Sequence, residues 1–141
     1  MSYPNAANAY RRTQAEAGTP LELVVMLYDG ALRFLTQAQD AMRARDIRAR
    51  HVALDKTLAI IGHLQSTLDT ERGGNISVEL DRLYSYMLGR LLEGAAQNDV
   101  SALGEVSKLL ADLRDAWHTI AATPPMPVGA TVGAGMLDAR P

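Results

Sequence analysis

Histidines are the residues of this chain best suited to bind a metal or to transfer protons near neutral pH, because the chain has no cysteine. His51, His63 and His118 form neither a His-Glu-x-x-His nor a Glu-x-x-His motif, the spacings that place two ligands on one helix face. Asp115-x-x-His118 is a single i,i+3 pair, which we interpret as solvated. His51 falls at an apolar seam position, which indicates an imidazole in the core or at its rim. We expect no metal, haem or other cofactor.

Nucleophiles and phosphate-binding loops are not indicated either. Gly73-Gly74 lacks the Gly-Lys-Ser/Thr ending of a phosphate loop and follows no strand pattern, so we interpret it as a turn between helices. No Gly-x-Ser-x-Gly elbow occurs. Asp112 and Asp115, with Arg114 between them, are typical of an exposed helix face and not of the pocket that a general acid needs. The sequence predicts a protein that is not an enzyme.

An arginine cluster, Arg43, Arg45, Arg48 and Arg50, surrounds the first predicted turn between helices. One interpretation is a solvated helix end whose cations favour the helix dipole. The other is a patch for an acidic partner. Asp40, Asp46 and Asp55 dilute the charge, so a nucleic acid is not the expected ligand.

Net charge and hydropathy narrow the classes of partner. The formal net charge is −2, and fourteen basic residues are spread among sixteen acids, which does not favour attraction to a polyanion. No apolar run approaches the roughly 20 residues that a membrane span needs. Residues 1–18 lack the apolar region of a secretory signal. We expect a cytoplasmic protein without stable membrane insertion.

The elements that would carry any site are helices. Residues 1–18 are polar and predicted to be a loose arm. Thr19-Pro20-Leu21-Glu22 is a helix start, with Thr19 as cap, proline at the first helical position and Glu22 completing a capping box. Apolar residues then recur with spacings of three and four up to Met42, which predicts an amphipathic helix ending near residues 43–45.

Three more helices follow by the same periodicity. Asp46 is expected to cap the second, which should end at Gly73-Gly74. Asn75 or Ser77 is expected to start the third, and Asp99 the fourth, which ends before Thr123. The proline- and glycine-rich residues 123–141 are predicted to be a disordered tail.

Short links between four helices require neighbours to run antiparallel. The predicted fold is therefore all-α, an antiparallel up-down four-helix bundle over residues 19–122, between the arm and the tail. The first helix has almost no polar face between Leu21 and Leu35. This breadth indicates either a central helix buried on three sides or an apolar surface left free for a partner segment.

Four ordered motifs resemble the flagellar secretion chaperone FliS family. Residues 19–35 (TPLELVVMLYDGALRFL) resemble its opening helix. Leu68-Asp69 with Gly73-Gly74 resembles its second loop, and residues 83–87 (LYSYM) resemble its third helix. Asn98-Asp99, Glu105-Val106 and residues 113–117 (LRDAW) resemble its fourth. The resemblance covers residues 10–120.

The resemblance implies an export chaperone that binds the disordered C-terminal segment of flagellin in the cytoplasm. It implies that binding prevents premature polymerisation and that the chaperone delivers flagellin to the export-gate protein FlhA. Tyr10 matches a tyrosine that in the family covers part of the groove and takes part in gate contact. Our groove candidates are apolar rows on the second and third helices. They are Ile47, Leu54, Leu58, Ile61, Leu68, Leu83, Tyr84, Met87 and Leu91.

Two other functions fit a helical bundle. One is a cofactor-binding bundle for electron transfer or a di-metal centre. The other is a regulatory module that associates with itself, for which a homodimer would be expected.

Overall fold

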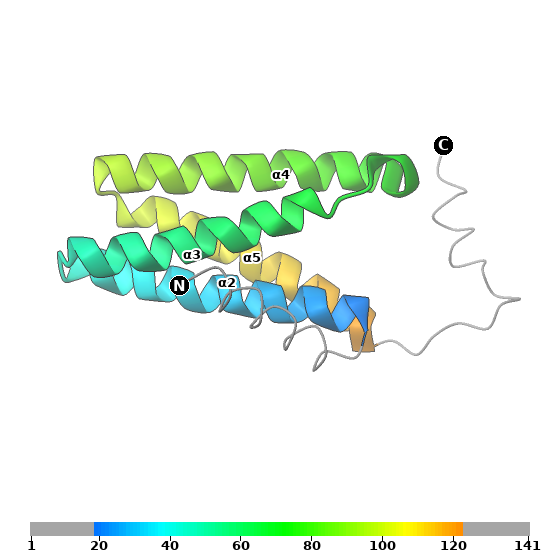
Figure 1. Ribbon diagram of the computed structural model, residues 1–141, viewed down its shortest axis with the longest axis horizontal. Helices are drawn as coiled ribbons and strands as arrows, with labels where there is room; N and C mark the ends of the chain where they lie inside the picture. The colour runs from blue at the N-terminus through cyan, green and yellow to red at the C-terminus, as the bar shows by residue number, and fades with distance from the viewer. Residues whose placement is uncertain (1–18, 123–141) are drawn as a thin grey trace, which may run out of the picture.

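The structure, a computed structural model, describes residues 19–122, which form four α-helices (Figure 1). They are α2 (Pro20–Arg43), α3 (Ile47–Ser66), α4 (Thr70–Gln97) and α5 (Val100–Ala122). Within these residues no strand occurs, and the predicted all-α class is confirmed. The arm over residues 1–18 and the tail over residues 123–141 lie outside the described residues.

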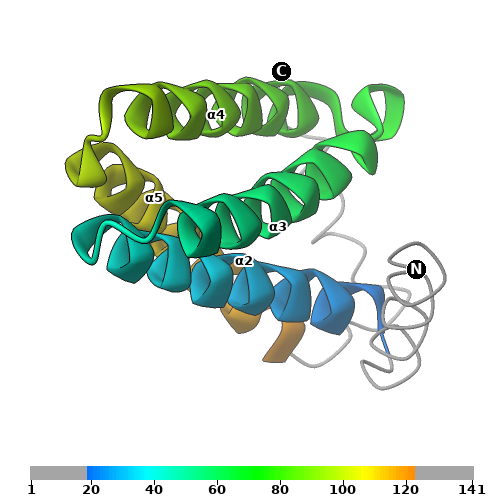
Figure 2. The ribbon, with the colours of Figure 1, turned by 60° about the vertical axis from the view of Figure 1, so that its left-hand side comes forward.

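The four helices form a ring in chain order. α2 packs against α3 and α5, and α4 packs against the same two helices from the other side. Figures 1 and 2 show α2 and α4 on opposite sides of the bundle. The links, residues 44–46, 67–69 and 98–99, are short, so consecutive helices run antiparallel. The predicted up-down bundle is confirmed.

Side-chain caps fix three of the four predicted helix starts. Thr19 Oγ1 accepts a hydrogen bond from Glu22 N (3.1 Å), ahead of a proline in the first turn. Asp46 Oδ1 accepts from Ala49 N (3.0 Å), and Asp99 Oδ1 accepts from Ser101 N (3.0 Å). Each oxygen satisfies a backbone donor that has no partner within its helix.

The junction between α3 and α4 differs from the prediction. α3 ends at Ser66, and α4 begins at Thr70 because Asp69 Oδ1 accepts hydrogen bonds from Glu71 N and Arg72 N. The glycine pair therefore lies inside α4 and produces a kink there, since Gly74 has a φ of 56°. Gly73 is required for a different reason: a Cβ atom at this position would lie 1.8 Å from Ser77 Oγ.

The core lies along the axis of the bundle and includes a polar pair. Tyr28 of α2 and Tyr84 of α4, 0% and 2% exposed, join their hydroxyls at 2.5 Å across the diagonal of the ring. Burial raises the pKa of both phenols. Between Leu21 and Leu35 every apolar side chain is buried or half-buried. Most of the apolar breadth of the first helix is thus covered within the bundle, where α2 packs against two neighbours, α3 and α5.

Candidate binding groove

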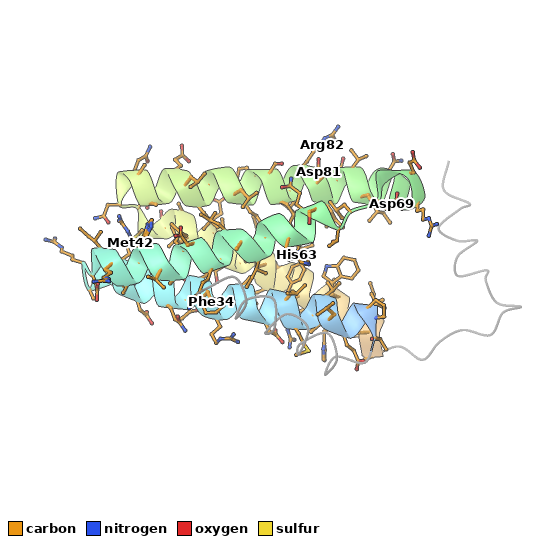
Figure 3. All side chains as sticks on the ribbon, viewed as in Figure 1. Phe34, Met42, His63, Asp69, Asp81 and Arg82 are labelled. Carbon is orange, nitrogen blue, oxygen red and sulfur yellow. The ribbon has the colours of Figure 1, made fainter. Side chains whose placement is uncertain are left out.

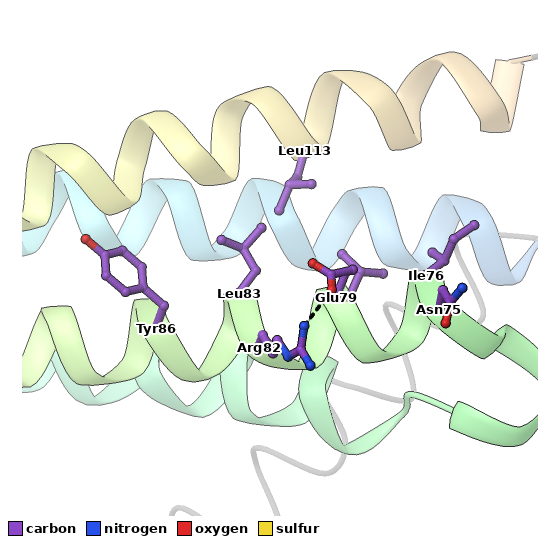
Figure 4. A pocket seen from close by; sticks show the side chains of 8 residues that line it. Asn75, Ile76, Glu79, Arg82, Leu83, Tyr86 and Leu113 are labelled. Carbon is purple, nitrogen blue, oxygen red and sulfur yellow. Dashed lines mark hydrogen bonds and ion pairs between the residues drawn. The ribbon is translucent and has the colours of Figure 1, made fainter.

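An apolar groove lies between the first half of α4 and the second half of α5 (Figure 4). Its volume is about 610 Å³. Ile76, Leu80 and Leu83 of α4 face Leu113 of α5 across it, and the figure shows Leu113 pointing from α5 toward α4. The remaining lining residues are Asn75, Glu79, Arg82 and Tyr86.

The groove follows from the sequence of α4 and from the angle between the two helices. Ile76, Leu80 and Leu83 are spaced four and three residues apart, so they lie on one helix face. Figures 1 and 4 show that α5 diverges from α4 toward the C-terminal end of α5. The apolar face of α4 is therefore only partly covered there, and Ile76 stays 47% exposed. The result is an open apolar strip on the outside of the bundle.

A polar cluster closes the groove at the end where the helices converge. Glu105 of α5 accepts hydrogen bonds from the Tyr86 hydroxyl and from Arg90 Nε (2.7 Å), both on α4. Arg90 Nη1 also donates to Glu93 (2.8 Å). These bonds lower the pKa of Glu105, first through Tyr86 and then through Arg90, and raise the pKa of Tyr86. The apolar strip therefore has a charged boundary.

A second apolar hollow, about 320 Å³, lies at the end of the bundle where α2 and α4 begin. It adjoins the groove, because Ile76 and Leu80 line both. Trp117 of α5 and Val24 of α2 also line this hollow. Together the groove and the end hollow form one apolar surface that runs from the side of the bundle around its end.

The groove lies between the third and fourth helices, whereas the candidate residues were placed on the second and third. Leu83 lines the groove, and Leu68 and Tyr84 line the end hollow. Leu58 packs against the core from α3. Ile47 is 69% exposed but lies at the opposite end of the bundle.

The expectation that the predicted rows stay uncovered is wrong for five of the candidates. Core and groove residues follow the same three-and-four spacing, so periodicity alone does not separate them. As partner contacts these residues remain predictions, and Tyr10 lies outside the described residues. The buried candidates are Leu54, Ile61, Tyr84, Met87 and Leu91.

Of the eight lining residues, only Leu83 was among the candidates. The missed apolar and aromatic residues are Ile76, Leu80, Tyr86 and Leu113, and the missed polar ones are Asn75, Glu79 and Arg82. Leu80 and Leu113 follow the three-and-four apolar spacing of the third and fourth helices. The missing information was the divergence of α4 and α5, which no single helix pattern contains.

Histidines and carboxylates do not gather into a site in the part of the chain that the structure describes. No group of three or more metal-ligating residues occurs there. His51 lies on the surface of α3, where its Nε2 is 3.3 Å from Asp55 Oδ2, and so is not a core imidazole. None of the helices within residues 19–122 is long and apolar enough to cross a bilayer.

Comparison with known proteins places the whole bundle in one family. The family model "Flagellar protein FliS" matches residues 3–124. The chain is 40% identical to the flagellar secretion chaperone FliSB of Pseudomonas aeruginosa over 119 residues, covering 82% of this chain and 94% of that protein. It is 37% identical to the flagellar secretion chaperone FliS of Salmonella typhimurium over 125 residues (85% and 93%), and 35% identical to that of Bacillus subtilis over 117 residues (83% and 86%). The chain therefore belongs to the FliS family of flagellar secretion chaperones.

Proposed function

We propose that this chaperone binds the disordered C-terminal segment of flagellin in the cytoplasm, with apolar side chains of that segment in the groove between α4 and α5. The observation that carries the proposal is the open apolar strip of Ile76, Leu80, Leu83 and Leu113. Bound in this way, the segment is unable to enter a filament prematurely. The complex then delivers flagellin to the export-gate protein FlhA, and no catalytic step is involved.

The physical requirements of such a ligand fit the groove. A disordered segment loses conformational entropy when it binds, so its receptor must bury a large apolar area to compensate. The groove and the adjoining end hollow together provide such an area. A segment that becomes helical would place side chains at i, i+4 and i+7 against the strip. The polar cluster around Glu105 would limit how far the segment extends along α4.

Calorimetric titration with a flagellin C-terminal peptide tests the proposal. Ile76→Asp should weaken binding about ten- to hundredfold, because a charge replaces an apolar contact worth roughly 1.5–3 kcal/mol. Val52→Asp on α3 is the matched control, since Val52 is 48% exposed and Ile76 is 47% exposed. Both variants should keep the helical content of the parent chain.

The proposal would be overturned by either of two results. In one, Ile76→Asp binds the peptide as tightly as the parent chain does. In the other, Val52→Asp weakens binding as much as Ile76→Asp. Light scattering of the same samples distinguishes a chaperone–peptide complex from self-association, because a homodimer would form without the peptide.

A further inference from the structure

The end of the bundle opposite the end hollow carries a different surface, formed at the turn between α2 and α3. Figure 3 shows Met42 at this end and Asp69 at the other. A hollow of about 410 Å³ lies there. Its lining residues are Ala41, Met42, Arg45, Asp46, Ile47 and Arg50, together with Asn98 from the neighbouring turn. Ile47 is 69% exposed, the highest value among the exposed large apolar residues of the described chain. We call this surface the arginine corner, and it also includes the adjacent Arg48.

The arginine corner has more positive than negative charge, because Arg45, Arg48 and Arg50 outnumber Asp46, the carboxylate that lines its hollow. Within residues 19–122, no carboxylate lies within 4 Å of the guanidinium of Arg45, Arg48 or Arg50, whose charges are therefore unpaired there. In this part of the chain, the Arg50 guanidinium donates to the neutral Asn98 amide oxygen (3.4 Å) and to no carboxylate. Asp46 caps α3, and Asp40 pairs with Arg43. The surplus is notable in a chain whose net charge is −2.

Two of these arginines are placed where the helix dipole disfavours a cation. Arg48 and Arg50 lie in the first turn of α3, which contains no acidic residue. The N-terminal end of a helix carries partial positive charge, so cations there reduce stability. The interpretation that the arginine cluster favours the dipole therefore holds for Arg43, in the last turn of α2, and fails for Arg48 and Arg50.

Arg45 also occupies a costly position. Arg45 has a φ of 59°, in the left-handed region. Asp46 N donates to Ala41 O (2.9 Å) and Arg45 N donates to Met42 O (3.2 Å), which is the Schellman motif at the C-terminal end of a helix. Glycine is the common residue at the left-handed position of this motif. The equivalent position after α4 holds Asn98, a residue that tolerates this conformation. Unfavourable conformations and charges that folding does not require are typical of binding sites.

We infer that the arginine corner binds an acidic segment of a partner polypeptide, with one apolar side chain of that segment against Ile47 and Met42 and its carboxylates on Arg45, Arg48 and Arg50. Guanidinium groups bind carboxylates with two parallel hydrogen bonds, which suits an arginine cluster to this ligand. The site is separate from the proposed flagellin groove, since the two surfaces share no lining residue.

The chain's own terminal segments lack the charge to fill this site. Residues 1–18 and 123–141 carry three arginines, Arg11, Arg12 and Arg140, against two carboxylates, Glu16 and Asp138. Charge complementarity therefore favours a separate polypeptide as the occupant. An anionic membrane also carries negative charge, but it has no apolar side chain of fixed position. Binding to phosphatidylglycerol vesicles distinguishes a membrane from a polypeptide.

The test uses the full chain and a fluorescent peptide in which glutamates flank one leucine, with two matched peptides. In one of these glutamine replaces glutamate, and in the other serine replaces leucine. We expect the glutamate–leucine peptide to bind about tenfold more tightly than either matched peptide, a difference of about 1.4 kcal/mol. Binding should weaken as salt rises. The double variant Arg45→Glu with Arg48→Glu should reduce it by a further tenfold or more.

The control is Arg33→Glu with Lys108→Glu, which changes the net charge equally at exposed positions outside the corner. It should leave peptide binding unchanged, and the corner variant should still bind the flagellin peptide as the parent chain does. Equal binding of the glutamate and glutamine peptides would overturn the inference. Equal loss in the control variant would also overturn it, as would binding to phosphatidylglycerol vesicles without binding to the peptide.

Discussion

The α4–α5 groove and the arginine corner are both open surfaces, yet their residues affect the stability of the fold differently. Ile76 and Leu83 continue the apolar stripe that packs α4 into the bundle. Ile76 is exposed and Leu83 is only half-buried because α5 diverges there. Arg45 and Arg48 belong to no stripe, and both are unfavourable for the local backbone or the helix dipole. An open surface can therefore consist of residues that continue the apolar pattern of the core, or of residues that lower local stability.

The two surfaces are separated by a core that joins all four helices. The Tyr28–Tyr84 hydroxyl pair crosses this core, and Arg114 of α5 binds Asp29 of α2 (Nε–Oδ1 2.7 Å) beside it. Substitutions in the core should change stability, whereas substitutions on either surface should change binding.

Tyr84→Asp should have the largest effect, because Tyr84 lines the end hollow and is also 2% exposed. Truncating a buried aromatic side chain costs about 3–5 kcal/mol, and an unpaired buried charge adds to that. Urea unfolding should show the full loss. A folded Tyr84→Asp variant with parent-like stability that loses only flagellin binding would show that the groove extends into what we describe as core.

Removing one hydroxyl of the pair should have the next largest effect. Tyr28→Phe or Tyr84→Phe leaves the other buried hydroxyl without its partner, which costs about 1–3 kcal/mol. Tyr28→Phe with Tyr84→Phe removes both polar groups and should cost less than the two single changes added together. Urea unfolding of all four chains measures this coupling. Strict additivity would mean that the hydroxyls do not stabilise each other.

Alkaline pH should destabilise the fold through the same pair. Burial raises the pKa of both phenols in the folded state, while the unfolded chain releases these protons near pH 10. The folded state then binds more protons than the unfolded state above pH 10. The free energy of unfolding is therefore fully retained below pH 10 and falls as pH rises, by about 1.4 kcal/mol per pH unit for each tyrosine.

The double phenylalanine variant is the control for this pH dependence. It lacks both groups and should show a shallower fall above pH 10 in urea unfolding. Parallel pH profiles for the double variant and the parent chain would place the titration elsewhere in the molecule.

Much of the fold could be predicted from the sequence, because helix starts and apolar spacing are local signals. Thr19, Asp46 and Asp99 cap helices as expected. The α3–α4 junction could not be predicted in the same way. Glycine pairs commonly end helices, but here Asp69 starts α4 before the pair, and the chain continues through a kink at Gly74.

The groove could be predicted only in part, because it depends on the angle between two helices. Leu83 was identified from its periodicity, but Met87 and Leu91 share that periodicity and are fully buried. Met87 and Leu91 lie in the core cluster, whereas the distance between α4 and α5 increases along α4 toward Ile76 (Figure 4). That distance is a property of the packed bundle. The arginine cluster, in contrast, could be identified from the sequence. The structure shows in addition that Arg45 has a positive φ and that Arg48 lies in the first turn of a helix.

Arg48→Glu should have the smallest effect and an unusual sign. A carboxylate in the first turn of α3 interacts favourably with the helix dipole, where Arg48 interacts unfavourably. The substitution should raise the free energy of unfolding by about 0.3–1 kcal/mol, and the increase should shrink as salt rises. Lys108→Glu, in the middle of α5, is the control and should not stabilise the chain. If Arg48→Glu instead lowers stability, Arg48 has a structural role, and the contrast between the two surfaces fails at the corner.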